Sequence, residues 1–387
     1  MIRKLTYVGM AAVMTACAGM LTGCTSGDGL NGSINGIKLS DQPIVLNAGV
    51  PGNVTEQPWG KSRAGDYSDY DDQSLDKFTL WIYSGTTRLY DLLDVKRTLG
   101  NGLQNCTVRN HLQIYWPVDK PLNLFAIQGD YPMESFRPVG DGTGVGVRIF
   151  NEQAKYDVMY AVTSNRTRLM DGGNVDLYFH HALSAVDLKL QNNTGFLKVT
   201  VHRAKIVNAR WIATLTLLPT APTGTGAHND VIWTEVEDGR QEYDMGASNH
   251  VLAPGAGVTL IDGPGQNNSR YILPQTLNTV NHSGDNSATA YFELDVTVTD
   301  SRSGYDIVRQ KTFKVAMTGS NGYQLMQDRR YVYTISFNDD VNTDKQFSIG
   351  AAVIDRPIYF GMMADDENNW TTEKWYWMPD DDILEQH

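Results

Sequence analysis

The sequence has few cysteines, and they cannot pair inside the folded chain. Its 387 residues contain three, Cys17, Cys24 and Cys106. Cys17 and Cys24 belong to an N-terminal apolar stretch and its end, so only Cys106 remains in the part expected to fold. One cysteine cannot make an internal disulfide. The fold must therefore be held by its core, and the chain is long enough for about two domains.

Positive charge is also scarce, because the formal net charge is −12 at pH 7. Binding to phosphate backbones needs a basic face, so this balance argues against a nucleic-acid partner.

Catalytic signatures are missing. The sequence contains no G-x-S-x-G elbow, P-loop, dinucleotide fingerprint or zinc-protease helix. Carboxylates are abundant, but they lie in loops and acidic runs with no spacing that favours one pair. We therefore expect no catalytic residues, no cofactor and no enzymatic activity.

A long apolar run occurs only at the start. Arg3 and Lys4 precede it, and it extends from Leu5 to about Leu21, the length of a signal-peptide core. It ends in "LTGC", which resembles a bacterial lipobox. The resemblance implies a signal peptide over residues 1–23 and palmitate or a similar lipid on Cys24; the alternative is an ordinary signal peptide with a chance cysteine. No later segment is apolar enough to span a bilayer, so the expected membrane contact is a lipid anchor.

Beyond a Gly-, Ser- and Asn-rich tether at residues 25–36, apolar residues recur with a period of two almost everywhere. Successive side chains of a strand point to opposite faces, so this pattern indicates strands with one buried and one wet face. The fold class is all-β, for which antiparallel sandwiches are the natural architecture. Only Tyr90–Arg97 has a briefly helical pattern. The clearest alternating sets are Val186, Leu188 and Leu190; Leu197, Val199 and Val201; Phe292, Leu294, Val296 and Val298; Phe313, Val315 and Met317; and Tyr331, Tyr333, Ile335 and Phe337.

A polar stretch at Ser164–Asp176 separates two groups of strands, and we place a domain boundary near Asp171. A later Gly-, Pro- and Thr-containing stretch from Pro219 is a competing boundary, or a long loop inside the second domain.

Two stretches superficially suggest metal ligands. His180 and His181 are adjacent on a predicted strand, so their side chains point to opposite faces and cannot easily share one ion. We interpret His181 as a structural residue that packs with Phe179. The segment 340–344 begins like a calcium loop, but Lys345 replaces the turn glycine and Ala351 the bidentate glutamate, which favours a solvated turn.

Several motifs, in a fixed order along most of the chain, resemble the fimbrillin family of Bacteroidales, the pilin subunits that are matured by a protease. Each motif is weak alone, and their ordered set is fairly specific. They are the lipobox, "SRA" (62–64), "FTLWIYS" (78–84), "YWPVDKPLNLFAI" (115–127), "VDLYFHHALSAVDLKL" (175–190), "YILPQTL" (271–277) and "RRYVYTISF" (329–337).

This resemblance implies two tandem transthyretin-like antiparallel β-sandwich domains, at residues 64–171 and 172–355. It also implies an outer-membrane lipoprotein precursor whose residues 24–63 form a lipidated tether and a removable first strand. The expected partners are other fimbrial subunits in a surface fimbria, an arginine-specific protease, and the outer membrane through the lipid on Cys24.

In this family an arginine-specific protease cuts after the first strand, and Arg63 matches that position, with Ala64 as the new N-terminus. The surrounding loop, "GKSRAGDYSDYDDQ", is polar and Gly-containing, which is typical of nicked segments. The apolar piece Ile37–Val50 before it can fill a strand position in the first sandwich. Lys61 and Arg88 are the nearest rival sites, and a surface arginine without a role is the plain alternative.

The C-terminal tail, residues 356–387, is too apolar for a disordered end. After a closing strand at Phe347–Ile354, the tail alternates in two short stretches, which resemble the donor appendage of the family. The alternative is that these stretches fold back onto the second domain. The candidate donor residues are Ile358, Phe360, Met362, Trp375 and Trp377.

A second class of function stays open at this point. A lipid-anchored tip or accessory protein that binds a glycan or a partner, without polymerising, would share the same export signals. The 19 tyrosines and 8 tryptophans suit sugar stacking, but aromatic residues also fill sandwich cores.

Overall fold

About 72% of the structure is β-strand and 3% is helix, which confirms the all-β class. The helical residues described are one turn, α1 (Arg168–Asp171), and a short 3₁₀ turn, η2 (Arg109–His111). The computed structural model describes residues 32–49, 68–69, 75–99, 103–129, 133–139, 144–152, 154, 157–219, 231–235, 239–256, 259–260, 270–278, 289–317, 324–339, 347–357, 361–362 and 373–377.

An eight-stranded sheet organises the first half, in the order β13-β3-β7-β6-β5-β9-β12-β14. It curves around an apolar core in which β3 and β13 face β5, β6, β9 and β12. The strands are β3 (Val45–Gly49), β5 (Lys77–Ser84), β6 (Thr87–Arg97), β7 (Gln104–Val108), β9 (Leu122–Gly129), β12 (Val158–Arg166), β13 (Asn174–Tyr178) and β14 (His180–His181).

Two smaller sheets complete this half. One has the order β1-β2-β8, and the other, β10-β11-β17-β18, covers the outer face of β5, β9 and β12 through a second apolar cluster. Their strands are β1 (Ser33–Ile34), β2 (Ile37–Pro43), β8 (Tyr115–Pro117), β10 (Met133–Val139), β11 (Gly144–Phe150), β17 (Ile212–Leu217) and β18 (Val231–Glu235).

The second half is a sandwich of a six-stranded sheet, β20-β15-β26-β27-β29 with β21 beside β15, and a four-stranded sheet, β19-β16-β23-β24. The largest apolar cluster fills the space between them. The strands are β15 (Ser184–Asn192), β16 (Leu197–Arg210), β19 (Arg240–Leu252), β20 (Thr259–Leu260), β21 (Arg270–Ile272), β23 (Tyr291–Asp300), β24 (Asp306–Ala316), β26 (Arg329–Asp339), β27 (Phe347–Pro357) and β29 (Glu373–Trp377).

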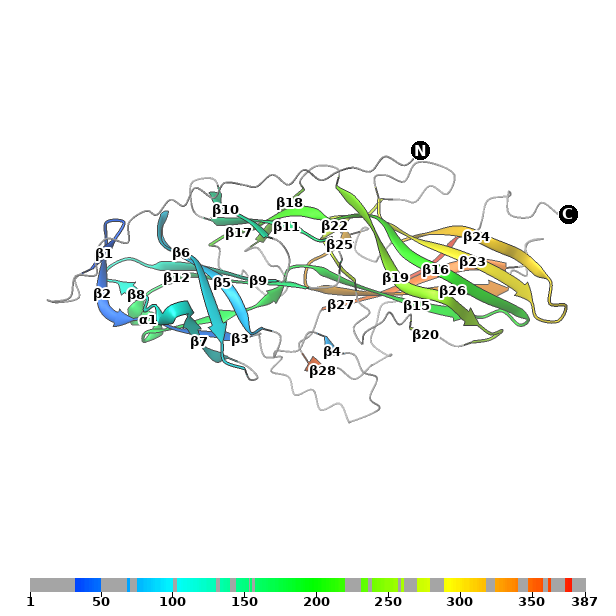
Figure 1. Ribbon diagram of the computed structural model, residues 1–387, viewed down its shortest axis with the longest axis horizontal. Helices are drawn as coiled ribbons and strands as arrows, with labels where there is room; N and C mark the ends of the chain where they lie inside the picture. Colours follow the sequence, from blue (N-terminus) through cyan, green and yellow to red (C-terminus); the bar gives the residue numbers. More distant parts are fainter. Residues whose placement is uncertain are drawn as a thin grey trace.

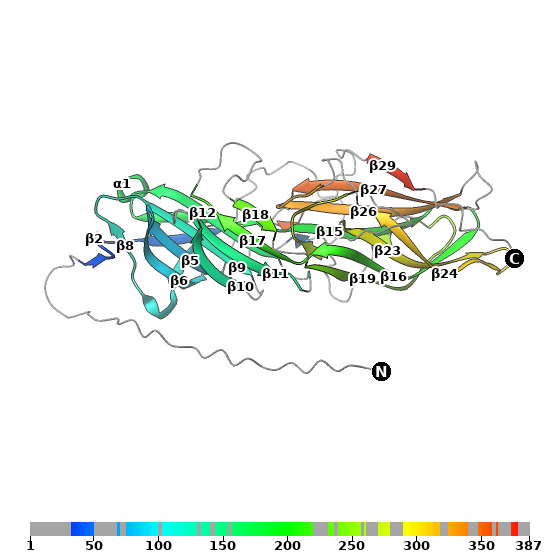
Figure 2. The same ribbon diagram turned by 90° about the horizontal axis from the view of Figure 1, so that it is seen from above.

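Two minor pairs join distant segments. β22 (Gln275–Thr276) pairs with β25 (Gln324–Leu325), and β28 (Gly361–Met362) pairs with β4 (Ser68–Asp69). The two halves give an elongated molecule, with β1, β2 and β8 near one end and the β23–β24 hairpin at the other (Figure 1). The view from above separates β15, β26 and β27 from β16, β19 and β24 as two layers of the second half (Figure 2).

The period-two pattern predicted the second half well. All five alternating sets lie in strands, except for Met317, which directly follows β24. Their apolar members are buried, as in β16 and β23, where Val199 pairs with Val298. The predicted closing strand at Phe347–Ile354 is β27, which pairs with β26 along its whole length.

The predicted helical turn at Tyr90–Arg97 is wrong, because these residues belong to strand β6. Leu92 has a left-handed φ of 49°, and the register to β5 shifts opposite it, between Leu80 and Ile82. Such a bulge inserts an extra residue and breaks the alternation. Apolar residues then recur three or four apart, as Leu89 and Leu93 do, and this spacing imitates a helix.

Strand pairing is mostly antiparallel, as expected, but two pairs are parallel. β3 runs parallel to β13, and β15 runs parallel to β26. Parallel neighbours need a long crossover, and both of these pairs join segments far apart in the sequence. The division near Asp171 stays a prediction. Pairings cross that position, since β13 and β14 join the first sheet and β17 pairs with β11.

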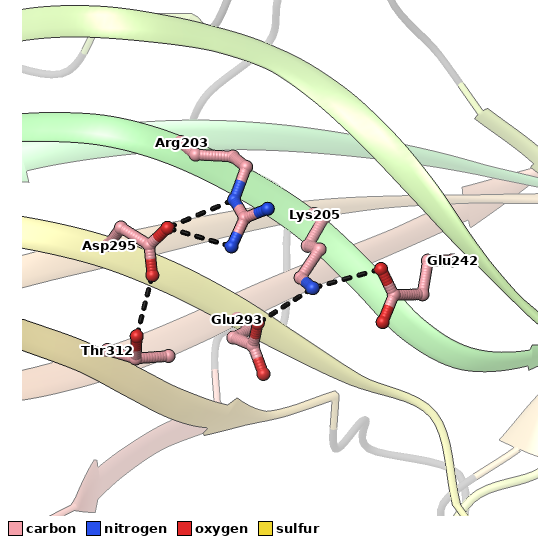
Figure 3. Close-up of polar contacts among 6 residues, drawn as sticks. All are labelled: Arg203, Lys205, Glu242, Glu293, Asp295 and Thr312. Atoms are coloured by element: carbon pink, nitrogen blue, oxygen red, sulfur yellow. Dashed lines mark hydrogen bonds and ion pairs between the residues drawn. The ribbon is translucent and has the colours of Figure 1, made fainter. Parts of the chain in front are cut away.

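The outer face of the four-stranded sheet carries a ladder of charges across its strands (Figure 3). Lys205 Nζ lies 2.9 Å from Glu242 Oε2 and 2.8 Å from Glu293 Oε1. Burial lowers the pKa of Lys205, but its hydrogen bonds to Glu293 and Glu242 leave it raised. Opposite charges on facing strands contribute roughly 0.2–1 kcal/mol per pair. The polar half of the alternation is therefore a paired, solvated surface.

The same ladder continues two residues earlier on β16. Arg203 contacts Asp295 Oδ2 through Nε and a terminal nitrogen, at 3.0 and 2.9 Å, and Thr312 Oγ1 donates to Asp295 Oδ1 over 2.7 Å. These bonds fix the side chains of three neighbouring strands on the outer face (Figure 3).

A different ion pair is buried between the two parallel strands of the second sandwich. Arg330 Nε of β26 lies 2.6 Å from Asp187 Oδ2 of β15, and the two side chains are 4% and 2% exposed. Removing one member of a buried pair leaves an uncompensated charge, whereas replacing both by apolar residues is often neutral.

We predict that Arg330→Met lowers the free energy of unfolding of the second sandwich by about 3–5 kcal/mol. The double variant Asp187→Leu with Arg330→Met should recover most of this loss. Urea titration followed by tryptophan fluorescence measures both. A single variant as stable as the wild type would contradict a stabilising role for the pair.

Candidate functional site: the first strand and its groove

The segment 32–49 before the predicted cleavage loop forms three strands of the first half, β1, β2 and β3. Strand β3 occupies an interior place, with parallel β13 on one side and antiparallel β7 on the other. The prediction that Ile37–Val50 fills a strand position is confirmed for residues 37–49, which the structure divides into β2 and β3. β2 therefore has partners on both sides in the three-stranded sheet, and β3 has partners on both sides in the eight-stranded sheet.

Apolar side chains hold the segment in the core. Each large one contributes on the order of 2 kcal/mol when fully buried, so loss of the segment would expose a long apolar trough. The buried members are Ile37, Leu39, Ile44, Leu46 and Ala48, none more than 7% exposed.

Main-chain hydrogen bonds hold both ends of β3. The amide of Ile44 donates to Ile114 O over 2.8 Å, and that of Val45 donates to Gly173 O over 2.9 Å. At the other end the amide of Phe179 donates to Gly49 O over 2.8 Å. If β3 left, the groove would keep these orphaned groups, and a new strand could satisfy them.

Gly173 shows why the turn before β13 needs glycine. Its φ is +98°, and a Cβ there would lie 2.6 Å from Gln42 Nε2. Gly172, at φ +59°, ends the helical turn α1. The polar stretch at 164–176 was expected to separate two groups of strands. In the structure it contains the turn that leads into β13, which runs parallel to β3.

Arg97 is the charged residue of this site that sequence reasoning missed. It ends β6, is 1% exposed, and its Nε donates to Ala48 O of β3 over 2.8 Å. The only sequence signal for the burial of Arg97 was the presence of apolar residues near it. Their spacing imitated a helix, so this signal was not recognised.

Cys106, the cysteine expected to remain, is half-buried on β7 beside the same place. Burial raises the pKa of its thiol to about 12, with the Arg97 charge and the Ala48 backbone partly offsetting that effect. A thiol with such a pKa is mostly protonated near neutral pH, so it oxidises slowly there and faster at raised pH.

Cys24, Arg63, Ala64, Ile358 and Phe360 lie outside the described residues, as does the rejected calcium loop at 340–344. Of the other candidate donor residues, Met362 lies in β28, and Trp375 and Trp377 lie in β29, which pairs with the edge of β27. In this structure β29 thus lies on the second sandwich, whereas β28 pairs with β4 outside that sandwich, and the donor role of these residues stays a prediction.

One surface cavity offers a different kind of site. It has a volume of about 700 Å³ and lies across β5, β6, β7 and β9. Its charged lining residues are Asp76, Lys77, Asp94, Lys96 and Arg109. Phe78 also lines it, but this ring packs against Phe179, with the centroids 5.0 Å apart. The cavity is therefore suited to a polar ligand more than to sugar stacking.

In the described part of the chain, no group of three His, Cys, Asp or Glu residues is placed to hold a metal. No helix among the described residues has the length and apolar character needed to cross a membrane.

The sequence model of one protein family, described as fimbrillin-like, matches residues 66–351. The chain belongs to the fimbrillin-like family. Membership supports a fimbrial subunit at the cell surface and favours a structural role over an enzymatic one. No curated protein matches this fimbrillin-like chain.

The chain is similar to several solved structures, the first of which supports the fold. A fimbrial protein from Bacteroides vulgatus is 12% identical, with a TM-score of 0.50, and the match covers 82% of this chain and 100% of that one. The tip fimbrial protein Mfa3 from Porphyromonas gingivalis, with a C-terminal truncation, is 11% identical, with a TM-score of 0.36 and coverage of 80% and 98%. The fimbrial anchor protein Mfa2 from the same organism is 10% identical, with a TM-score of 0.28 and coverage of 80% and 97%.

His181 of this fimbrillin is fully buried, as is Phe179, and its Nδ1 is hydrogen-bonded to the fully buried Asp157 carboxylate. Burial by itself lowers the pKa of His181, but the charge and hydrogen bond of Asp157, with the charge of Asp328, leave it raised. Burial raises the pKa of Asp157, and His181 offsets part of this shift. The pair therefore holds a proton more tightly in the folded than in the unfolded state.

We predict that His181→Gln lowers the free energy of unfolding by about 1–3 kcal/mol without changing metal content. Because the folded pKa is raised, the proton-linked stability is complete below about pH 6.5 and is lost as pH rises through the folded value. The wild type should thus lose more stability than the variant between about pH 6 and pH 9. Denaturant titrations test the slope; equal slopes, or stoichiometric metal that the variant lacks, would overturn this structural role.

Proposed function

We propose that this fimbrillin is a structural pilin of adhesive surface fimbriae. The precursor is exported as an outer-membrane lipoprotein through Cys24, is cut after Arg63, and polymerises by strand exchange. The observation that carries the proposal is the interior position of β3, whose chain continues into the segment with Arg63. A single cut there separates an interior strand from the rest of its sheet.

The consequence of the cut follows from the pairing. Residues before Arg63 supply β1, β2 and β3, so their departure would open β7 and β13 together with the apolar trough between them. Two facing strand edges with a trough are a receptor for an extended peptide, since main-chain bonds give affinity and alternate side chains fill pockets.

The tail supplies the complementary strand in this proposal. β29 adds to the outer edge of β27, and β28 pairs with the short β4 alone among the described strands. An edge strand is held on one side only, so it can be exchanged more easily than an interior strand. In the polymer the tail of one subunit would enter the groove of the next.

A second candidate function has its own support. The charged cavity over β5, β6 and β7 suits a polar ligand, and a tail docked on β27 suits a subunit that ends a fibre. A lipid-anchored tip or accessory protein that binds a glycan or partner would use both features without polymerising.

We predict that an arginine-specific protease trims the folded precursor to a product beginning at Ala64. Arg63→Ala should abolish trimming and polymer formation, while Arg88→Ala, the rival site in β6, should leave both unchanged. Cys24→Ala should abolish labelling by radioactive palmitate. N-terminal sequencing and SDS-resistant ladders are the readouts; surface material that never begins at Ala64 would favour the anchored alternative.

We also predict that truncation after Pro357, which keeps β27 whole, leaves a folded and trimmed subunit that cannot extend a fibre. Truncation after Asp366, which removes β29 but keeps residues 358–364, separates the two stretches of the tail. Ladder length on gels measures extension. Long polymers from subunits that all end at Pro357 would show that the tail is not the donor, and unfolding of that variant would make it part of the second sandwich.

A further inference from the structure

Arg97 bridges the two sides of the segment that contains Arg63. Its Nε donates to Ala48 O before that segment, and its Nη1 lies 3.4 Å from Leu75 O after it. Its backbone amide also donates to Asp76 O over 2.8 Å. A cut between residues 49 and 75 would therefore leave Arg97 in contact with both products.

The contact of Arg97 with β3 restricts which strand can occupy this place. Ala48 is fully buried, and the half-buried Cys106 lies beside its backbone. A buried guanidinium needs acceptors for its donors, and leaving one unsatisfied is unfavourable. Whatever strand fills this place has to offer a carbonyl to Arg97 and a small side chain.

These two requirements define a register. Carbonyls and side chains alternate along a strand, so a slip of one residue turns every side chain to the other face and moves the carbonyl away. A slip of two residues returns each side chain to its original face of the sheet, but it puts a different side chain at the position of Ala48. The first strand meets the requirement with Ile44, Leu46 and Ala48, two large residues and then a small one at alternate positions.

We propose that Arg97 sets the register of the strand that replaces β3, and that Ala364 of a neighbouring subunit takes the place of Ala48. This inference rests on the proposed strand exchange. In the tail, Phe360, Met362 and Ala364 repeat the order large, large, small at alternate positions. Trp375 and Trp377 are followed at the next alternate position by Pro379, which has no amide hydrogen for the sheet.

Cys106 makes the register measurable in the full chain. The pairs Asn47–Asn105 and Ala48–Gln104 place Leu46 opposite Cys106 when the antiparallel register is continued by one residue. Cysteine at position 362 of an incoming tail would therefore lie opposite the neighbour's Cys106. Cysteine at position 364 would face Gln104 and lie diagonal to Cys106, roughly 7–8 Å away, beyond the usual reach of a disulfide. Cysteine at position 358 would lie four residues from position 362, about 13 Å along the strand, beyond the reach of a disulfide.

The experiment expresses Met362→Cys, Ala364→Cys and Ile358→Cys separately in the fimbriated host and oxidises the surface material at raised pH, where the Cys106 thiolate forms more readily. We expect subunit-to-subunit disulfides from position 362, at least about tenfold above positions 364 and 358, and their loss when Cys106→Ser is added. Equal yields at all three positions, or the highest yield at position 364, would overturn the register. Polymers without a disulfide at any position would instead refute the tail as donor, and with it the proposed strand exchange.

Arg97 itself is tested by Arg97→Lys, which keeps the charge but loses the planar fork of donors. We expect the preference for position 362 over positions 364 and 358 to fall about tenfold, with trimming at Arg63 unchanged. An unchanged preference would overturn the assignment of Arg97.

A tail variant covers the case in which Arg97→Lys does not fold. Ala364→Leu should reduce polymer yield about tenfold, because the small place cannot hold leucine. The matched Met363→Leu, at the half-exposed position of Asn47, should not. Equal polymer yields from the two would overturn the proposal.

Discussion

The structure of the first half depends on one constraint: a buried backbone must find partners for its amides and carbonyls. β3 meets it from both sides, through β7 and β13, and Arg97 adds a side-chain donor where β3 ends. The neighbouring core is shaped to this strand, with small Ala48 beside Arg97 and larger Leu46 and Ile44 farther along. Because sheet and core are both built around β3, anything that replaces it must reproduce its main chain as well as its side chains.

The second half meets the same constraint in a different way. β15 and β26 are parallel, interior and tied by the buried Asp187–Arg330 pair, while the charge ladder of Arg203 and Lys205 keeps the outer face of the other sheet solvated. Its one addition from the tail, β29, sits on an edge. The two halves therefore differ in where the strands of the proposed exchange lie: β3 is an interior strand of the first half, and β29 is an edge strand of the second.

Much of this could be predicted from the sequence, because a period of two survives wherever one face is wet. Val199, Val298 and Tyr333 were placed correctly for that reason. Leu92 was not, because a bulge depends on the backbone of one residue and leaves a pattern that imitates a helix. The parallel pairing of β3 with β13 could not be predicted from the sequence, since it joins segments more than a hundred residues apart that share no local signal. Arg97 could not be recognised because a charged residue at the end of a strand is normally exposed.

The long crossover between β3 and β13 has a consequence for how the chain folds. Asn47 Nδ2 donates to Asp176 Oδ1 across a sequence separation of 129 residues. Closing so large a loop is entropically unfavourable, so contacts of this kind form late and folding is slow. We expect the sheet from β5 to β12 to be assembled before the first strand arrives. The sheet from β5 to β12 would then form without the first strand, and the proposed removal of that strand would return the chain to this earlier state.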